Sequence, residues 1–278
     1  MAQKKTPLCI QDVTALIEGH APLSLGHPED ELGLLAGDPQ DLVTGVATCW
    51  SPTVAVLRKA ATSGLNMVVC HEPLTYRVCG RGVEAGLKWY DERHPTAKIP
   101  NQKRMALALA HGIAVCRYHS NWDVAPQYGI GATLARKLGL GSDFITESMV
   151  PTYVVEPISV RSVAERACSA LGLGPIRLIG DPERLVSRVS LCYGGFGQMF
   201  TIAEVALAHS AELAVFGEML DYTIRYCVDC DLPAIELGHY ESEQPGVEAM
   251  ADFLRQRLPP DVPVQCIPSG EPWIYFNA

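Results

Sequence analysis

Hydrophobic positions along the chain fall into short continuous runs that alternate with longer amphipathic stretches. The runs are rich in Val, Ile, Leu and Cys, which is typical of buried strands. The amphipathic stretches often begin at Ser, Asn or Pro and end near Gly, as helices do. This alternation predicts an α/β protein with a mainly parallel sheet flanked by helices. We expect strands at 42–50, 65–70, 113–118, 151–155, 185–192, 213–217, 233–237 and, at a sheet edge, 262–267, and helices at 52–64, 101–112, 129–138, 162–171, 202–209 and 244–258.

A glycine-containing break at residues 139–149 separates two such alternating units. The length of 278 residues suits two domains of roughly 100–150 residues each. A second glycine run, Gly194 to Gly197, lies between an expected strand and an expected helix. Its backbone N–H groups could cradle a phosphate, but the run lacks the spacing of a nucleotide-binding motif. A tight turn is the favoured interpretation of these glycines.

Three of the apolar runs stop at a histidine that has a carboxylate close behind it. The pairs are His71 with Glu72, His119 with Asp123, and His239 with Glu243. Because the carboxyl ends of parallel strands share one edge of a sheet, these side chains are expected to converge. If a helix starts at His239, the i, i+4 spacing also places His239 and Glu243 on one helix face.

Mixed imidazole and carboxylate ligation suits Zn, Mn, Fe, Co or Ni. Six ligands are too many for one catalytic ion with an open position, but they suit two ions that share a bridging carboxylate. The alternative is that each histidine is an ordinary surface or hydrogen-bonded residue. For a single histidine at a strand end, the ordinary interpretation is the more common one. Three histidine–acid pairs in one chain are harder to explain in that way.

Charge and composition narrow the classes of function. The net charge of −9 argues against a broad nucleic-acid-binding surface. Ten cysteines are sparse for a chain of this length, and several lie in apolar runs, where thiols behave as small hydrophobes. The N-terminal stretch lacks the apolar segment of a signal peptide, and no run reaches transmembrane length. These features predict a reduced, cytoplasmic protein with no membrane partner.

Four segments in combination resemble the Nif-three-like family, whose members are also called GTP cyclohydrolase type 2-like proteins with a dinuclear metal centre. DELGLLAGDP, Asp30 to Pro39, is similar to an early Gly-Leu…Gly-Asp-Pro segment of that family. HEPL at His71 to Leu74 stands where the family has His-His-Pro-Leu. HSNWDVAP, His119 to Pro126, and GHYESE, Gly238 to Glu243, are similar to its other two histidine motifs.

The resemblance implies a two-domain protomer in which the second α/β domain is inserted into the first. The expected domains are residues 1–142 with 236–278, which bind metal, and the inserted residues 143–235. It also implies a toroidal homohexamer whose paired divalent metal ions face an internal cavity. The ligands that it implies are His71, His119, Asp123, His239 and Glu243, with the acids as bridges.

Two departures from the family pattern mark this chain as a diverged member. Glu72 replaces the second histidine of the first motif, which implies a retained site with altered metal preference. The alternative is that Glu72 points away and that one ion is weak or absent. GEMLDY, 217–222, retains an acid at Glu218 but has Leu220 and Tyr222 where the family has Lys and His.

The leading hypothesis is a metal-dependent hydrolase that cleaves a C–N bond in a small polar substrate. Glu72 is the candidate general base if it is not a ligand, and Glu218 is a candidate general acid or substrate contact. Four aromatic residues flank the ligands and could stack on a planar substrate or simply pack: Trp50, Tyr76, Trp122 and Tyr240. The competing hypothesis is a non-enzymatic hexameric scaffold that stores or delivers metal, or serves a regulatory partner.

Overall fold

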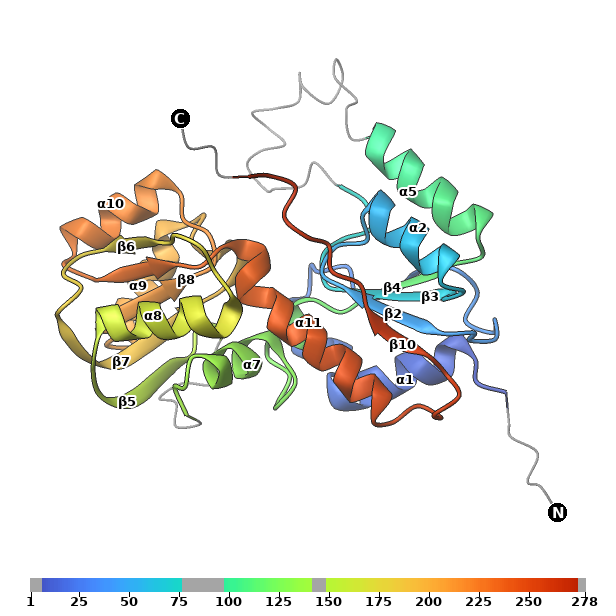
Figure 1. The fold of residues 1–278 in the computed structure, drawn as a ribbon, viewed down its shortest axis with the longest axis horizontal. Helices are drawn as coiled ribbons and strands as arrows, with labels where there is room; N and C mark the ends of the chain where they lie inside the picture. Colours follow the sequence, from blue (N-terminus) through green and yellow to red (C-terminus); the bar gives the residue numbers. More distant parts are fainter. Residues whose placement is uncertain (1–6, 77–97, 142–148, 275–278) are drawn as a thin grey trace. The chain divides into compact units, whose positions relative to one another are not determined.

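The computed structural model describes residues 7–76, 98–141 and 149–274 (Figure 1). The chain forms two compact units. The first unit is Met1–Asn121 with Ala251–Ser269, and the second is Trp122–Met250 with Gly270–Ala278. Two of the three divisions, after residues 121 and 250, fall inside helices α6 (Ser120–Asp123) and α11 (His239–Arg255). The expected domain boundaries at 142 and 236 lie elsewhere in the chain and stay a prediction.

The sheet of the first unit has five strands in the order β1-β4-β3-β2-β10. Its strands β2, β3, β4 and β10 run parallel, and β1 pairs antiparallel with β4. The parallel prediction and the edge position of the last strand are therefore confirmed. The strands are β1 Gly33–Ala36, β2 Val46–Cys49, β3 Met67–Cys70, β4 Ala114–Arg117 and β10 Val264–Cys266.

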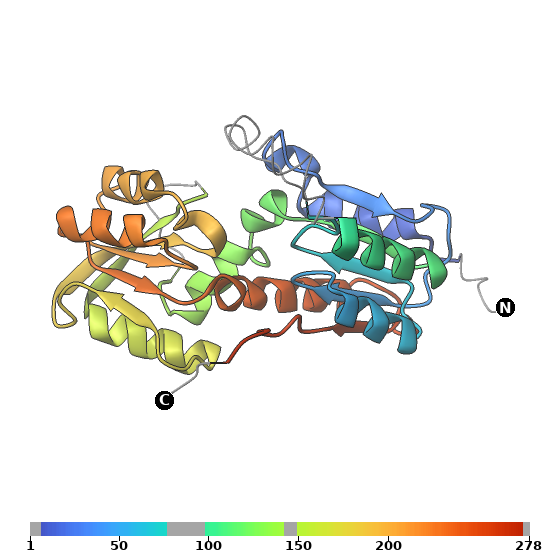
Figure 2. The ribbon, with the colours of Figure 1, turned by 90° about the horizontal axis from the view of Figure 1, so that it is seen from above.

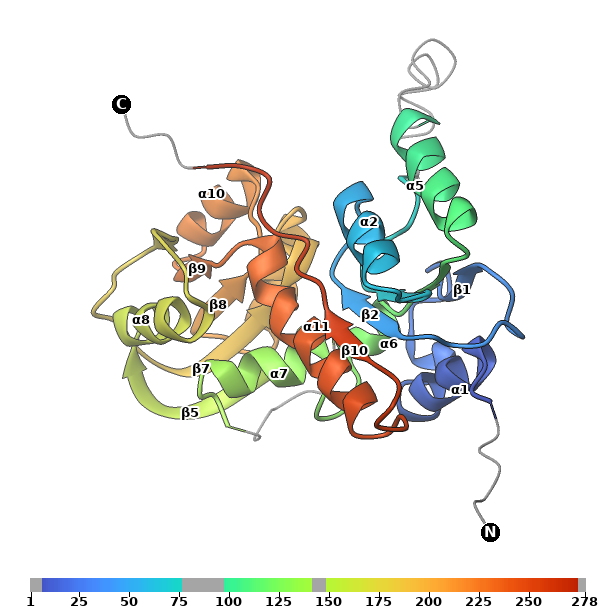
Figure 3. The ribbon, with the colours of Figure 1, turned by 45° about the vertical axis from the view of Figure 1, so that its right-hand side comes forward.

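Helices cover both faces of this first sheet. Helices α2 (Val54–Thr62) and α5 (Lys98–Ala110) lie on one face, and α1 (Ile10–His20) lies on the other (Figures 1 and 3). Helix α2 begins two residues after the expected start at 52 and is capped by Thr53, whose side chain accepts the N–H of Val56 at 3.2 Å. The apolar face of α2 then packs on β2 and β3 in one core cluster.

The sheet of the second unit has the order β5-β7-β8-β9-β6. Its three central strands are parallel, as predicted, and the two edge strands are antiparallel to their neighbours. The strands are β5 Thr152–Ser159, β6 Arg177–Ile179, β7 Leu185–Cys192, β8 Leu213–Phe216 and β9 Ala234–Glu236.

In the second unit, α9 and α10 pack together over one face of the sheet, and α8 covers the other (Figure 2). Buried Ala203 and Ala206 of α9 and Cys227 of α10 share a core cluster with the sheet residues Ala214 and Phe216. The helix bounds in this unit are α7 Ile130–Lys137, α8 Val160–Leu171, α9 Phe200–Ala208 and α10 Asp221–Asp229, with short 3-10 turns at Leu23–Leu25 in the first unit and Gly194–Phe196 in the second.

Several elements differ from the sequence-based expectation. Helices α1 and α10 and strands β1 and β6 were not predicted, and α11 begins at His239 rather than at 244. Pro245 looks like a helix start, but it lies inside α11, which continues past it without that one N–H donor. The largest difference concerns β9, because it pairs with β8 and β6 in the second sheet. We had expected the three strand ends that precede the histidines to share one sheet edge. That prediction is wrong, because the strand before His239 belongs to the second sheet.

None of the helices in the described residues is long and apolar enough to cross a membrane.

The buried thiols predict a loss of stability in alkali. The pKa of Cys227 rises from its ordinary value of 9.0 to about 11, because the thiol is buried and because Cys230 lies nearby. The folded protein holds this proton more tightly than the unfolded chain does. Its contribution to stability is therefore complete below pH 9 and is lost as the pH rises toward 11.

Urea denaturation at a series of pH values measures this effect. Above pH 9 the free energy of unfolding should fall by about 1.4 kcal/mol per pH unit for this thiol alone. Cys227→Ala should remove that part of the slope, whereas Cys168→Ala, at a partly exposed position of α8, should retain it. Equal slopes in the two variants would contradict the assignment.

Candidate metal centre

Two of the predicted ligands of the first unit follow neighbouring parallel strands. His71 comes directly after β3, and His119 comes two residues after β4. The pairing of Cys70 with Arg117 brings these strand ends together, and the two imidazole rings lie 4.7 Å apart. Ligand atoms of His71 and His119, and of His71 and Glu72, lie within 4.8 Å of each other. Within the first unit, His71 therefore has His119 and Glu72 as neighbouring candidate ligands.

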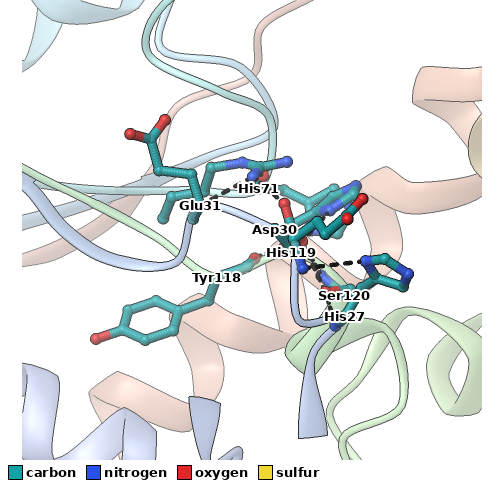
Figure 4. A network of polar contacts seen from close by, with 9 residues as sticks. His27, Asp30, Glu31, His71, Tyr118, His119 and Ser120 are labelled. Carbon is teal, nitrogen blue, oxygen red and sulfur yellow. Dashed lines mark hydrogen bonds and ion pairs between the residues drawn. The ribbon is translucent and has the colours of Figure 1, made fainter. Parts of the chain in front are cut away.

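His71 is fully buried and is fixed through its backbone and its ring. Its backbone N–H donates to the carbonyls of Cys49 at 3.2 Å and Trp50 at 3.1 Å. Its Nδ1 lies 3.2 Å from the Tyr118 carbonyl oxygen (Figure 4). Because a carbonyl can only accept, Nδ1 carries the proton, and Nε2 is then the nitrogen with a lone pair for a metal.

The Nδ1 atom of His119 also faces an oxygen acceptor, which in this case is a charged carboxylate. This nitrogen lies 2.7 Å from Oδ2 of Asp30, which also accepts the Ser120 backbone N–H at 3.2 Å and the Ser120 hydroxyl at 2.6 Å (Figure 4). Arg117 forms an ion pair with the other oxygen of Asp30. Burial alone would raise the pKa of Asp30, but the contacts with His119, Ser120 and Arg117 lower it strongly overall. Asp30 is therefore a carboxylate and an acceptor.

In the second unit, His239 and Glu243 lie on one face at the start of α11, as their spacing predicted. Nε2 of His239 is 3.4 Å from Oε2 of Glu243, and Nδ1 is 3.3 Å from Oε1 of Glu218. Gln198 donates its side-chain N–H to the same Glu218 oxygen. The pKa of Glu218 is lowered by its hydrogen bond with His239 and, against some burial, by Gln198.

The glycine turn between β7 and α9 closes over this pair of ligands. The backbone N–H of Gly194 donates to the Ser242 hydroxyl at 3.0 Å, and that hydroxyl donates to the His239 carbonyl at 2.8 Å. Gly194 has φ +59°, and a Cβ there would collide with the Glu243 carboxylate. The segment is a tight turn, the interpretation that its glycines favoured, and it shapes the site.

Asp123 is buried at the end of α6, near the same turn. The hydroxyl of Tyr193 donates to the Asp123 carbonyl at 3.5 Å. The pKa of Tyr193 is raised by burial and then by the negative charges of Asp123 and Glu243. Both predicted bridging acids therefore lie near one buried tyrosine. Asp123 is the last residue of α6, a single helical turn, and it follows His119 by four residues in sequence.

The candidate aromatic residues lie in different environments. Trp122 is fully buried, and its indole N–H donates to the Gly246 carbonyl at 3.1 Å, which supports the packing alternative for this residue. Tyr76 is half exposed, and its hydroxyl accepts from Arg104 at 2.7 Å. Trp50 and Tyr240 are partly exposed. The carbonyl of Trp50 accepts the backbone N–H of Glu72 at 2.7 Å, so it fixes the strand end that carries this acid.

Sequence reasoning did not assign a role to Asp30, Arg117 or Ser242. Arg117 offered a signal, since it is a charged residue inside an otherwise apolar strand. Asp30 offered none, because 89 residues separate it from His119. The donor chemistry itself fits borderline divalent ions, since it combines imidazoles of fixed tautomer with buried carboxylates. These residues therefore fit the metal site that the sequence suggested.

Comparison with known proteins gives a consistent result. The chain is 22% identical over 262 residues to the "GTP cyclohydrolase 1 type 2 homolog" of Clostridium perfringens, covering 91% of this chain and 94% of that protein. It is 26% identical over 231 residues to the protein of the same name in Escherichia coli K12, covering 83% and 85%. The solved structure of a Bacillus cereus protein related to NIF3 is similar in fold, with a TM-score of 0.78, 15% identity, and coverage of 98% and 100%.

The word "homolog" in those names records similarity and states no activity. The two-unit α/β fold is that of the NIF3 structures. The sequence pattern of the family described as Duf34/NIF3 (NGG1p interacting factor 3) matches residues 8–272. That match spans nearly the whole chain, and the protein therefore belongs to the Duf34/NIF3 family.

Proposed function

We propose that this protein is a metal-dependent hydrolase that cleaves a C–N bond of a small polar molecule, such as a cyclic amide, an amidine or a heterocycle. The site would hold two divalent ions, and the names of the relatives favour a cyclohydrolase type of reaction. The proposed ligands are the residues of the three histidine–acid pairs. They are His71, Glu72, His119, Asp123, His239 and Glu243.

The observation that carries the proposal is a shared feature of the three histidines. Each presents its Nδ1 to an oxygen acceptor: the Tyr118 carbonyl for His71, Asp30 for His119 and Glu218 for His239. Histidines that bind metal through Nε2 almost always have such a partner at the other nitrogen. His209, which belongs to none of the three motifs, also has its Nδ1 3.2 Å from a carbonyl oxygen, that of Val150. The proposal therefore rests on this feature together with the acid that follows each of the three histidines.

Two divalent ions, when bound, supply a Lewis acid and lower the pKa of water for attack on a carbon–nitrogen bond. The protein's own residues then have separable roles. Glu72 is the proton acceptor if it does not bind metal, because it lies beside His71 at the strand end. Glu218 contacts His239 and is 38% exposed, so it can also reach a substrate. The homohexamer that the family resemblance implies is part of this proposal.

Metal content per chain, measured after purification without chelator, tests the site. We expect two divalent ions per wild-type chain and at least one fewer in His239→Ala, because that imidazole is a proposed ligand. Glu72→Gln should retain both ions and lose activity if Glu72 is the base, and it should lose an ion if Glu72 is a ligand.

The loaded protein should also hydrolyse at least one member of a panel of cyclic amides, amidines and purine nucleotides. A wild-type protein without bound metal would contradict the metal centre. A fully loaded protein without turnover on the whole panel would contradict the hydrolase and favour the scaffold.

A further inference from the structure

A buried ion pair lies behind the two histidines of the first unit. The side chains of Asp30 and Arg117 are 12% and 7% exposed. Removing two opposite charges from water is costly, and a well-packed apolar pair is often at least as stable. A gain in stability is therefore a weak explanation for the presence of a buried ion pair here. The contacts of the two side chains indicate a different role.

Several contacts of the pair lead to a candidate ligand or to its neighbour in sequence (Figure 4). One oxygen of Asp30 accepts from His119 Nδ1 and from the backbone and hydroxyl of Ser120. The backbone N–H of His27 donates to the same hydroxyl at 2.8 Å, so the Ser120 side chain is held as well. Asp30 is thereby fixed in position and cannot follow a rotation of the His119 ring.

Arg117 extends the network to His71. Its Nε donates to the His71 carbonyl at 3.0 Å, and its Nη1 donates to the Glu31 carbonyl at 3.0 Å. One guanidinium therefore fixes the backbone of His71, the segment that carries Asp30, and the Asp30 carboxylate itself. Arginine suits this position because its planar donor fork stays charged when buried.

We propose that Asp30 and Arg117 are positioning residues that hold the His119 and His71 rings with Nε2 available for metal. This inference rests on the proposed metal centre and assigns residues that act through its ligands. A carboxylate at Nδ1 also makes an imidazole a stronger donor. His119 has a carboxylate there and His71 has a neutral carbonyl, so loss of Asp30 should weaken chiefly the ion that His119 binds.

The informative substitution is Asp30→Asn, which preserves shape but changes the donors. Because Arg117 can only donate hydrogen bonds, the amide oxygen of the new asparagine should face its guanidinium. The amide N–H groups then face Nδ1 of His119, which must accept, and the proton moves to Nε2. A protonated Nε2 does not bind metal.

Titration of the metal-free protein with Co²⁺, followed by the visible absorption of the bound ion, measures the effect. Asp30→Asn should lower the affinity for one of two Co²⁺ ions by about 10–100-fold and change its absorption spectrum. Asp252→Asn is the matched control, because it removes an exposed Asp–Arg pair of the same unit and should leave both unchanged. The circular dichroism and melting temperature of the metal-free variants report any general damage to the fold.

If Asp30→Asn does not fold, the double variant Asp30→Asn/Arg117→Gln removes both buried charges and can be titrated in its place. Wild-type affinity and spectrum in the folded variant would overturn the positioning role and leave the metal centre intact. A wild-type protein that binds no Co²⁺ would overturn the metal centre itself. The two failures are thus distinguishable.

Discussion

Gly194→Ala is expected to abolish or strongly weaken binding of the metal ion that Glu243 is proposed to hold, although residue 194 is not a proposed ligand. The new Cβ would collide with the Glu243 carboxylate and approach His239 Nε2 to 3.3 Å. Glu243 is almost fully buried, so its carboxylate has little room to move aside. We expect a loss of one ion per chain, or a fall in affinity on the order of 100-fold, in a Co²⁺ or Zn²⁺ titration.

The matched control is Gly172→Ala in the same unit. Gly172 ends α8 with φ +69°, close to the +59° of Gly194, but a Cβ there meets no atom within 4 Å. Both substitutions therefore carry the same left-handed backbone strain of about 1–2 kcal/mol. Only Gly194→Ala adds the collision. Equal metal binding by the two variants would show that the turn does not shape the site.

The elements that the sequence predicted well are those whose signal is local. Apolar runs such as 65–70 and 185–192 coincide closely with β3 and β7, and α7 begins at Ile130, one residue after the expected start. The strand-end histidines were found in the same way, because an ionisable residue after an apolar run needs no knowledge of the fold. Helix α1 was not found, because its N-cap is Cys9, which is outside the usual set of capping residues.

Features that depend on pairing over long distances could not be predicted. The sequence marked the segment before His239 as a strand but held no information that β9 joins a second sheet. The contact of Asp30 with His119 has the same character, since each residue lies in a different element and the fold alone brings them together. The unit boundary inside α6 is also invisible in sequence, because a continuous helix shows no break there.

The structure also changes how the acidic residues are divided. Sequence reasoning separated ligands from catalytic acids by motif alone. In the structure, Asp30 and Glu218 both contact a histidine through Nδ1, while Glu243 lies at Nε2 of His239. Under the proposed metal centre, an acid at Nδ1 is placed to orient the histidine, and an acid at Nε2 is placed to share a metal ion with it. Glu218→Gln should on this basis affect metal binding as well as turnover.

Trp122→Ala is expected to destabilise the protein by about 3–5 kcal/mol, the usual cost of removing a large buried aromatic side chain. Trp122 is fully buried, and its indole N–H binds the carbonyl of Gly246, one residue after Pro245 in α11. Gly246 is itself tightly packed, since a Cβ there would lie 2.7 Å from the Cα of Ile130 in α7. Trp122 therefore links α6, which ends at Asp123, to the helix that carries His239 and Glu243.

Urea denaturation of the metal-free protein measures this stability without any effect of bound ions. Trp122→Phe retains most of the buried area but leaves the Gly246 carbonyl without the indole donor, so it should cost about 1–3 kcal/mol. Tyr222→Ala, at a 79% exposed aromatic residue of the same unit, should stay within about 0.5 kcal/mol of wild type. If Trp122→Phe instead kept full stability and raised KM for a substrate, the ring would be a stacking platform. The burial of Trp122 favours the loss of stability, because a ring that no solvent reaches cannot stack on a ligand unless the core around it opens.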